Sequence, residues 1–356
     1  MSTGGAHEGP PGGELDRRKA YILATVVYEY IATAEPVASQ SLTQKYNLGV
    51  SSATVRNEMA ELEAGGYLVQ PHTSAGRIPS DAGYRLYVDQ LMKPERLDSE
   101  DRRHIREELR EASAELDEII EGTTRLLGRL SKNLAFVTKP ASETTTFKHI
   151  QLIWLSPRTG VAIVVTSLGV SAQSLFELSI DASPDDFTRL SNGLNARLGN
   201  RELRAISEAD IAGTTTQLGL HDDLKNAVLG ALRTAGSGEQ QPLTASGAQN
   251  LLDQPEFHDL RKLRSILQIV EEQKTLYDLV ADSMNVESPA VKIGHELGVE
   301  ELTDFSIVTV PYRFGKHAIG MLSILGPRRM PYARLMALAS GTADTLSERL
   351  SDVEIK

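Results

Sequence analysis

Residues 50–80, VSSATVRNEMAELEAGGYLVQPHTSAGRIPS, decide the fold of the first part of this chain. Val55, Met59 and Leu62 recur at helical spacing and form one apolar stripe. Ser51 is a suitable N-cap, because its hydroxyl can accept hydrogen bonds from the free amides of a first turn. The Gly-Gly pair that follows tolerates the left-handed backbone found past a helix end. The stretch therefore predicts a capped amphipathic helix with a loop and strand behind it.

Small and polar side chains occupy the other face of this predicted helix. At about 100° per residue, Ala53, Arg56, Asn57 and Ala60 lie opposite the apolar stripe. Arginine and asparagine have the geometry that best matches guanine and adenine edges in the major groove. A solvated surface helix shows the same pattern, so the context must decide between the two interpretations.

The neighbouring segments predict a winged helix-turn-helix over residues 15–92. Ser39 is expected to cap a short helix, and Ser80 is expected to cap the fourth. A hairpin after the central helix would form the wing. The expected elements are a helix at residues 15–34, a short helix at 40–46, a turn at 47–50, the central helix at 51–64, a hairpin at 68–78 and a fourth helix at 81–92.

The charge of residues 15–92 is slightly acidic, with seven Lys and Arg against eight Asp and Glu. A DNA-binding domain is commonly basic, so the composition argues mildly against such a role. Three of the carboxylates lie in the later turns of the central helix, whereas this motif contacts DNA through its N-terminal turns. Backbone amides at the helix starts near Ser39 and Ser51 can also bind phosphates. Modest affinity per subunit, and therefore a dimer, is expected.

The length of 356 residues suggests two or three domains, and the net charge is −11. The chain has no cysteine, which excludes disulfides and thiolate metal sites. Residues 1–14 are rich in glycine and proline and predict a disordered lead-in. They contain no apolar core of a secretory signal, and no run approaches the ~18 apolar residues of a membrane span. We expect a soluble, cytoplasmic protein.

Residues 93–135 predict a long linker helix. Apolar residues follow alternating steps of four and three, which is a heptad-like seam. Such a seam fits a helix that lies on its own domain, and it also fits an intersubunit coiled coil; the first is slightly favoured. The seam consists of Ile105, Leu109, Ala112, Leu116, Ile119, Thr123, Leu126 and Leu130.

The rest of the chain alternates between β-branched runs and helical patterns, which predicts an α+β sheet domain with an insertion at residues 184–235. The expected strands are residues 150–155, 161–166, 170–178, 289–293, 306–311 and 318–325, and the expected helices are residues 257–282 and 332–350. His295-Glu296 lacks the second histidine of a zincin motif, and residues 326–330 fit a turn with solvated arginines better than an anion site. No nucleophile–base pair or phosphate loop is signalled, so we expect no enzyme, metal or cofactor.

Several motifs together resemble the HrcA heat-inducible transcription repressor family. They are SSATVRNEM, HTSAGRIPS, GYRLYVDQLM, IGHEL, SIVTVPYRFG and IGMLSILGPRRMPYARLM, and the resemblance covers roughly residues 15–350. It implies a winged-helix domain at 15–92, a linker at 93–135, a GAF-like domain at 136–183 and 236–356, and an inserted dimerising domain at 184–235.

The resemblance also implies a function and its partners. The family represses class I heat-shock operons by binding an inverted-repeat operator, CIRCE, as a homodimer on double-stranded DNA. Its partner is the chaperonin GroEL, and its place is the cytoplasm, at the nucleoid when bound to DNA. The residues at the family's DNA-contact positions are Ser51, Ser52, Thr54, Arg56, Asn57, His72, Thr73, Ser74 and Arg77.

Two other functions remain open from the residues alone. The GAF-like domain could sense a small molecule, which would make the chain a metabolite-responsive winged-helix regulator. Alternatively, the winged helix could bind protein, and a lack of salt dependence would favour that interpretation. For the heat-shock function, marginal stability offers a mechanism: heat lowers the fraction of repressor that is folded, and a chaperonin restores that fraction.

Overall fold

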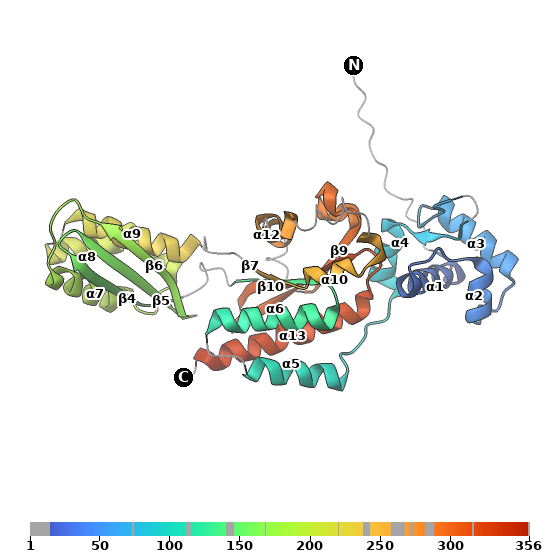
Figure 1. The fold of residues 1–356 in the computed structure, drawn as a ribbon, viewed down its shortest axis with the longest axis horizontal. Coiled ribbons are helices and arrows are strands. Elements are labelled where there is room, and N and C mark those ends of the chain that lie inside the picture. Colours follow the sequence, from blue (N-terminus) through green and yellow to red (C-terminus); the bar gives the residue numbers. More distant parts are fainter. Residues whose placement is uncertain are drawn as a thin grey trace, which may run out of the picture.

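The structure is a computed structural model. It describes residues 15–72, 75–111, 115–139, 146–167, 169–219, 221–237, 243–257, 268–270, 273–281, 288–314 and 317–354. The elements form three parts in a row (Figure 1): the N-terminal helices at one end, a five-stranded sheet with its helices in the middle, and a small sheet with three helices at the other end.

The N-terminal part consists of helices around a two-stranded hairpin. Ile22, Leu23, Val26 and Val27 face the core, as their spacing predicts. Ser80 caps the fourth helix, as expected, by accepting a hydrogen bond from the amide of Gly83 at 3.1 Å. The elements are α1 Arg17–Thr33, α2 Ser39–Lys45, α3 Ser52–Ala64, β1 Leu68–Val69, β2 Ile78–Pro79 and α4 Asp81–Leu86, which runs on as the π-helical η1 Tyr87–Leu91.

Val55 lies in the centre of this core and is fully buried. Val55→Ala should lower the free energy of unfolding by about 2 kcal/mol, since it removes buried methyl groups and leaves a cavity. Chemical denaturation measures the change. Ala60→Ser, at an exposed position of the same helix, is the control and should stay near wild type. Equal stability of both variants would contradict the placement of the apolar stripe.

The expected linker helix is two helices, α5 Ser99–Glu111 and α6 Leu116–Ser131. The prediction of one continuous helix was wrong, because Glu115 takes an extended conformation (ψ 129°) at the start of α6. The two helices contact each other, and both contact α13 (Tyr332–Glu354) of the same chain. The seam residues Ile105 and Ile119 are buried in that contact. The apolar seam thus packs on its own domain, while Ala112 lies outside the described residues.

The middle part is an antiparallel sheet covered on both faces. Its strand order is β7-β3-β10-β9-β8. Side chains alternate across β3: Ala135 and Val137 join the core under α6 and α13, whereas Leu134 and Phe136 join a second core on the other face. α5, α6 and α13 lie together on one side (Figure 1). The strands are β3 Leu134–Thr138, β7 Leu243–Ser246, β8 Ala290–Ile293, β9 Phe305–Phe314 and β10 His317–Pro327.

The return from the insertion and the helix after it complete the middle part. At residues 243–246, β7 pairs with β3, and its apolar Leu243 fills the sheet's second core. Of the helix expected at residues 257–282, the structure describes α12 at Gln273–Ala281, and residues 258–267 and 271–272 lie outside the described residues. The short elements are α10 Ala248–Leu252, η4 Pro255–Phe257, η6 Gly294–Leu297 and η7 Glu300–Leu302.

The third part has a separate core. The strands expected at residues 150–178 are present, and they form their own sheet, β4-β5-β6, which packs on three helices. The expected boundary at residue 184 therefore falls between elements that share one core. The elements are β4 Phe147–Ser156, β5 Thr159–Thr166, β6 Gly169–Glu177, α7 Pro184–Leu198, η3 Leu203–Ala205, α8 Glu208–Leu218 and α9 Asp222–Ser237.

Candidate nucleic-acid interface

The helix α3 has one buried face and one exposed face. Val55, Met59 and Leu62 are buried, as the apolar stripe predicts. The face that the sequence assigned to solvent or DNA is exposed along its whole length. Its members are Ala53, Arg56, Asn57 and Ala60.

The start of α3 is fixed by its cap. Ser51 accepts a hydrogen bond from the amide of Thr54 at 3.2 Å, and the two hydroxyl oxygens lie 3.0 Å apart. Ser51 is exposed, whereas Ser52 and Thr54 are half-buried. The three hydroxyl side chains thus surround the first turn of the helix, next to Arg56.

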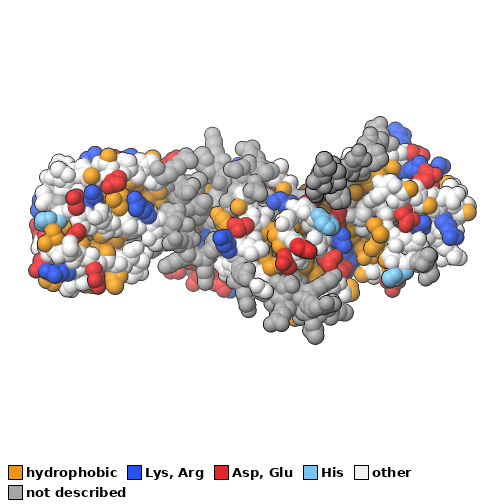
Figure 2. All heavy atoms as spheres, turned by 90° about the horizontal axis from the view of Figure 1, so that it is seen from above, with side chains coloured by type: hydrophobic (Ala, Val, Ile, Leu, Met, Phe, Trp, Pro, Cys, Tyr) orange, Lys and Arg blue, Asp and Glu red, His pale blue; other side chains and the backbone are white. Residues whose placement is uncertain are grey.

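The carboxylates of α3 are paired with cations of other elements. Glu58 accepts from Arg18 Nε at 2.9 Å, and Glu61 lies 2.8 Å from Lys19 Nζ. Glu63 accepts from Arg77 Nε at 2.9 Å. These ion pairs neutralise the carboxylates in the later turns of α3. Residues 15–92 are slightly acidic overall, yet the exposed face of α3 can still present a cation. Among the described residues, Arg56 forms no ion pair. Figure 2 shows Lys, Arg, Asp and Glu side chains mixed, rather than separated by sign, over this end of the molecule.

The hairpin after α3 has a short ladder, with Leu68 opposite Pro79 and Val69 opposite Ile78. Its loop is closed by the amide of Ala75, which donates to the carbonyl of His72 at 2.8 Å. His72 is exposed. Thr73 and Ser74, which the resemblance assigns to DNA contact, lie outside the described residues.

Arg77 joins the hairpin to the helices. Its backbone exchanges two hydrogen bonds of 2.9 Å with Val37, and its side chain is only 14% exposed. Gly76 permits this approach, because a Cβ there would lie 2.4 Å from the carbonyl oxygen of Val37. The guanidinium of Arg77 is paired with Glu63. In this structure Arg77 therefore stabilises the hairpin and does not project toward solvent.

We expect Arg77→Ala to lower stability by about 1 kcal/mol, the scale of a partly exposed ion pair with one good hydrogen bond. If this hairpin contacts DNA, the affinity should fall by a similar factor at every salt concentration, because the hairpin loses its support. A titration of affinity against salt measures this. A decrease of about one unit in the salt slope would instead indicate the phosphate contact expected from the sequence.

The predicted cap at Ser39 was wrong. Ala38 is the N-cap of α2, and Ser39 is its first helical residue, half-buried. The reason is that Val37 is held in a bridge to Arg77, so the extended backbone reaches only to Ala38 before the helix begins.

A carboxylate buried in α1 holds α2 in place. Glu29 forms an ion pair with Lys45 and accepts from the hydroxyl of Tyr46 at 2.8 Å. These hydrogen bonds, first from Lys45 and then from Tyr46, hold the pKa of Glu29 below its usual value of 4.5 despite burial. Burial, with help from Glu29, raises the pKa of Tyr46 to about 12. The charge of Glu29 therefore contributes to the position of α2 beside α3.

The lowered pKa of Glu29 predicts a pH dependence. Because the folded pKa lies below the unfolded one, the stabilisation is complete above the unfolded value of about 4.5 and is lost as the pH falls through the folded value. We expect Glu29→Gln to be less stable than wild type at pH 7, with the difference narrowing below pH ~4.5. Thermal unfolding at pH 7, 5 and 3.5 measures it. A constant difference between the two proteins would contradict the ion-pair account.

A polar cluster docks the N-terminal part on the central sheet. Asp81, at the start of α4, accepts from the backbone amide of His295 at 3.2 Å and lies 2.7 Å from its Nδ1. Its other oxygen accepts from Arg328 at 2.7 Å, and Arg328 also contacts Asp304 at 3.2 Å. Burial alone would raise the pKa of Asp81, but the hydrogen bonds from His295 and Arg328 outweigh it and lower the pKa.

A second pair of contacts extends this docking. Arg85 on α4 donates to Glu296 at 2.9 Å and to the carbonyl of Val291 at 2.7 Å. Arg329 pairs with Glu256 and donates to Gln254 at 2.9 Å. Arginines 328 and 329 were expected to be solvated in a turn. The turn is present at the end of β10, but both side chains are engaged.

Sequence reasoning singled out His295, Glu296 and the two arginines without recognising their role. The sequence analysis considered them as metal ligands or an anion site, and it placed residue 81 only as the start of the fourth helix. Asp81 and Arg85 lie more than 200 positions from His295, Glu296 and Arg328, so local spacing carries no signal for these contacts. Among the described residues, no group of His, Asp and Glu could hold a metal ion, and no helix is long and apolar enough to cross a membrane.

Comparisons with known proteins agree on one family. Residues 117–336 match the family model described as HrcA protein C terminal domain. The chain is 37% identical over 341 residues to a protein of Pelotomaculum thermopropionicum named heat-inducible transcription repressor HrcA, covering 96% of this chain and 98% of that one. A protein of the same name from Clostridium perfringens strain SM101 is 36% identical, covering 95% and 99%.

A solved structure, titled as that of a hypothetical protein, has a TM-score of 0.62 and 25% identity, covering 96% of this chain and all of that one. The chain is thus one of a class of transcription repressors with mixed α/β architecture. It belongs to the HrcA family and acts in negative regulation of heat-shock genes.

Proposed function

We propose that residues 15–92 form a winged helix-turn-helix that reads operator DNA with the exposed face of α3. The observation that carries this proposal is the electrostatic arrangement of that helix. Its three carboxylates are neutralised from other elements, and Arg56 is exposed on the second turn without an ion pair among the described residues. A helix with neutralised carboxylates and an exposed arginine suits the major groove, which is flanked by phosphates and exposes base edges.

The proposed contacts follow from the resemblance and the exposed surface. Arg56 and Asn57 read bases, and the hydroxyls of the first turn bind phosphates. Ser39, at the start of α2, and Arg77, at the base of the hairpin, stand beside this surface and support it. The full proposed set is Ser39, Ser51, Ser52, Thr54, Arg56, Asn57, His72, Thr73, Ser74 and Arg77.

We propose further that the operator is the inverted repeat CIRCE and that a homodimer binds it. A dimer suits an inverted repeat because each subunit reads one half-site. The domain division proposed for this function keeps the winged helix at 15–92 and a GAF-like domain around the five-stranded sheet. The dimerising insert is proposed to include β4, β5 and β6, since they share a core with α7, α8 and α9.

The outer face of the sheet β4-β5-β6 supports the insert as the dimer contact. Ile153, Val161 and Leu175 form one row across the three strands. Ile153 is 39% exposed and Leu175 is 67% exposed, on the face opposite the buried core. Apolar rows of this kind are typical of interaction surfaces. Sedimentation of Leu175→Asp should show monomers, while Leu252→Asp, at an exposed position outside the insert, should stay dimeric.

In this proposal heat inactivates the repressor, and the chaperonin GroEL returns it to its active state. The repressor is proposed to lie in the cytoplasm, and at the nucleoid when it is bound to DNA. The protein is proposed to act without catalysis, metal or cofactor. The proposal rests on the family's resemblance and on the marginal stability of proteins.

The decisive experiment is a footprint and affinity titration on DNA that carries CIRCE, compared with a shuffled sequence, before and after a heat step. We expect protection of both half-sites, binding that weakens as salt rises, and lower active protein after heating, restored by GroEL. Equal affinity for both sequences would overturn the operator proposal. Full recovery of binding by the heated protein alone would overturn the role of GroEL.

A further inference from the structure

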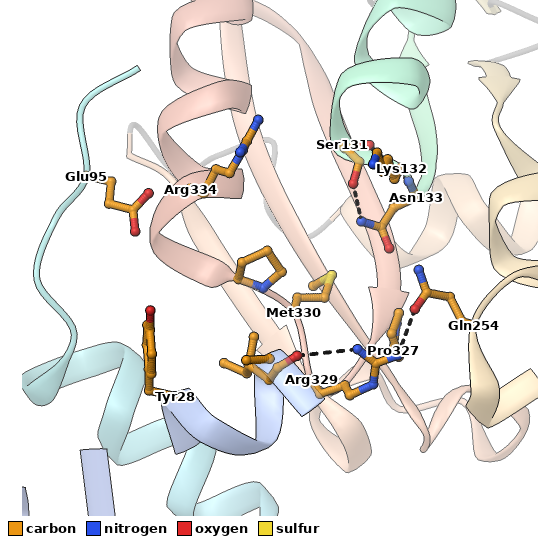
Figure 3. A pocket seen from close by; sticks show the side chains of 13 residues that line it. Tyr28, Glu95, Ser131, Lys132, Asn133, Gln254, Pro327, Arg329, Met330 and Arg334 are labelled. Carbon is orange, nitrogen blue, oxygen red and sulfur yellow. Dashed lines mark hydrogen bonds between the residues drawn. The ribbon is translucent and has the colours of Figure 1, made fainter. Parts of the chain in front are cut away.

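A cavity of about 530 Å³ lies where the N-terminal part meets the central sheet. Tyr28 and Ile31 of α1 form one wall, and the turn after β10 with the start of α13 forms another. Lys132, at the end of α6, forms part of a third (Figure 3). The cavity therefore touches the DNA-binding part and the central part at once.

The walls combine apolar surface with more positive than negative side chains. Ile31 and Met330 provide apolar surface beside the ring of Tyr28. The cationic side chains on the walls are Lys132, Arg329 and Arg334, and among the described residues that line the cavity Glu95 is the carboxylate. The lining therefore suits an apolar body that carries a negative charge.

The three cations differ in how far they are already satisfied. Arg329 is 14% exposed and is committed to Glu256 and Gln254. Arg334 is 54% exposed and lies 3.3 Å from Asp101, and Lys132 is exposed and forms no ion pair with a described residue. Lys132 is thus available to an anion in the cavity, and Arg334 can bind one with the guanidinium nitrogens that do not contact Asp101.

We propose that this cavity binds a small organic anion with an apolar body, and that occupancy changes operator affinity. The second half of the proposal rests on the proposed DNA-binding function. The apolar body contacts Ile31 and Met330, and the anionic group pairs with Lys132 and Arg334. This places an effector site between the N-terminal part and the central sheet, outside the interior of the GAF-like fold.

The coupling follows from how α1 is connected. On one side, Arg329 Nη1 lies 3.4 Å from the carbonyl oxygen of Ile31, next to the cavity. On the other side, Arg18 of the same helix pairs with Glu58 of α3. A ligand that displaces or braces α1 against the central sheet therefore changes the position of α3.

The test uses 8-anilinonaphthalene-1-sulfonate, an aromatic sulfonate whose fluorescence rises in apolar surroundings, on the full chain without DNA. We expect saturable binding of one probe per subunit. Arg334→Glu should weaken it at least tenfold by reversing a charge at the site. Ala32→Trp, which fills the cavity from α1 and leaves the cations intact, should abolish it. Arg103→Glu, an exposed arginine on α5, is the control and should bind normally.

Probe binding that is unchanged in both cavity variants, or that is lost in Leu175→Asp instead, would overturn the site. A second titration measures operator affinity at saturating probe, and a change of threefold or more, absent in Ala32→Trp, is expected. An unchanged affinity would overturn the coupling. If the chain does not bind the operator at all, the DNA-binding proposal fails, and the fluorescence titration still decides whether the cavity binds an anion.

Discussion

Arg56→Ala should weaken specific operator binding by about 1–3 kcal/mol, the cost of losing a bidentate contact to a base. Binding to a shuffled sequence should change far less, so the ratio of specific to non-specific affinity should decrease by a factor of about 5 to 150. The reason is local: Arg56 stands on the exposed face of α3, beside carboxylates that are already paired. Affinity titrations on both DNA sequences at one fixed salt concentration measure the effect.

Arg103→Ala is the matched control for this experiment. Arg103 is a helical arginine with 63% side-chain exposure, and it lies on α5, away from the proposed interface. Its loss should leave both affinities unchanged. If Arg56→Ala behaves in the same way as this control, α3 does not read bases through Arg56, and the proposed groove face is wrong.

Gly294→Ala should disrupt the docking of α4 on the central sheet. Gly294 has φ +55°, and a Cβ there would lie 2.3 Å from a carboxylate oxygen of Asp81. The left-handed backbone alone costs an alanine about 1–2 kcal/mol. The clash in addition displaces Asp81 from His295 and Arg328. We expect a lower melting temperature and faster hydrogen exchange in residues 81–91.

Gly298→Ala separates the two causes. Gly298 also has positive φ, +72°, but a Cβ there would meet no atom within 4 Å. This variant should show the lower melting temperature that the strained backbone causes, without faster hydrogen exchange in α4. Similar exchange in both variants would indicate that the contact with Asp81 does not hold the N-terminal part in place.

The best-predicted region of the molecule is α3, because the signals that define it are local. Ser51 caps it, Val55 faces the core and Arg56 faces outward, and each follows from spacing within one or two turns. The exposed face of the candidate site was therefore available from the sequence alone. The pairing of its carboxylates was not, since Arg18 and Glu58 lie 40 positions apart.

The errors arose where distant contacts override local preference. Ser39 is a good capping residue, but the bridge between Val37 and Arg77 starts the helix one residue earlier. The heptad-like seam is real, yet α5 and α6 fold against α13 instead of continuing as one helix. Both outcomes depend on packing between segments that a periodicity does not connect.

The boundary proposed for the insert also depends on contacts that a local pattern does not show. Strands β4, β5 and β6 have the apolar alternation expected of any half-buried sheet, so the pattern does not say which core they join. The structure joins them to α7, α8 and α9, and the start of α7 at Ser183 is fixed by a capping box with Asp186. Sequence patterns alone therefore did not place these strands in one core with the three helices.

The ring of Tyr84 in α4 meets that of Tyr332 in α13 edge to face, with centroids 6.0 Å apart, and one core extends from Ile22 to Leu350. The N-terminal helices and the central sheet consequently share one hydrophobic core, and we expect them to melt together. The proposed insert has its own hydrophobic core, so we expect it to melt separately. If the insert is the dimer contact, as proposed, a rise in temperature would separate the subunits while the N-terminal helices of each are still folded, and repression would end without unfolding of the whole repressor.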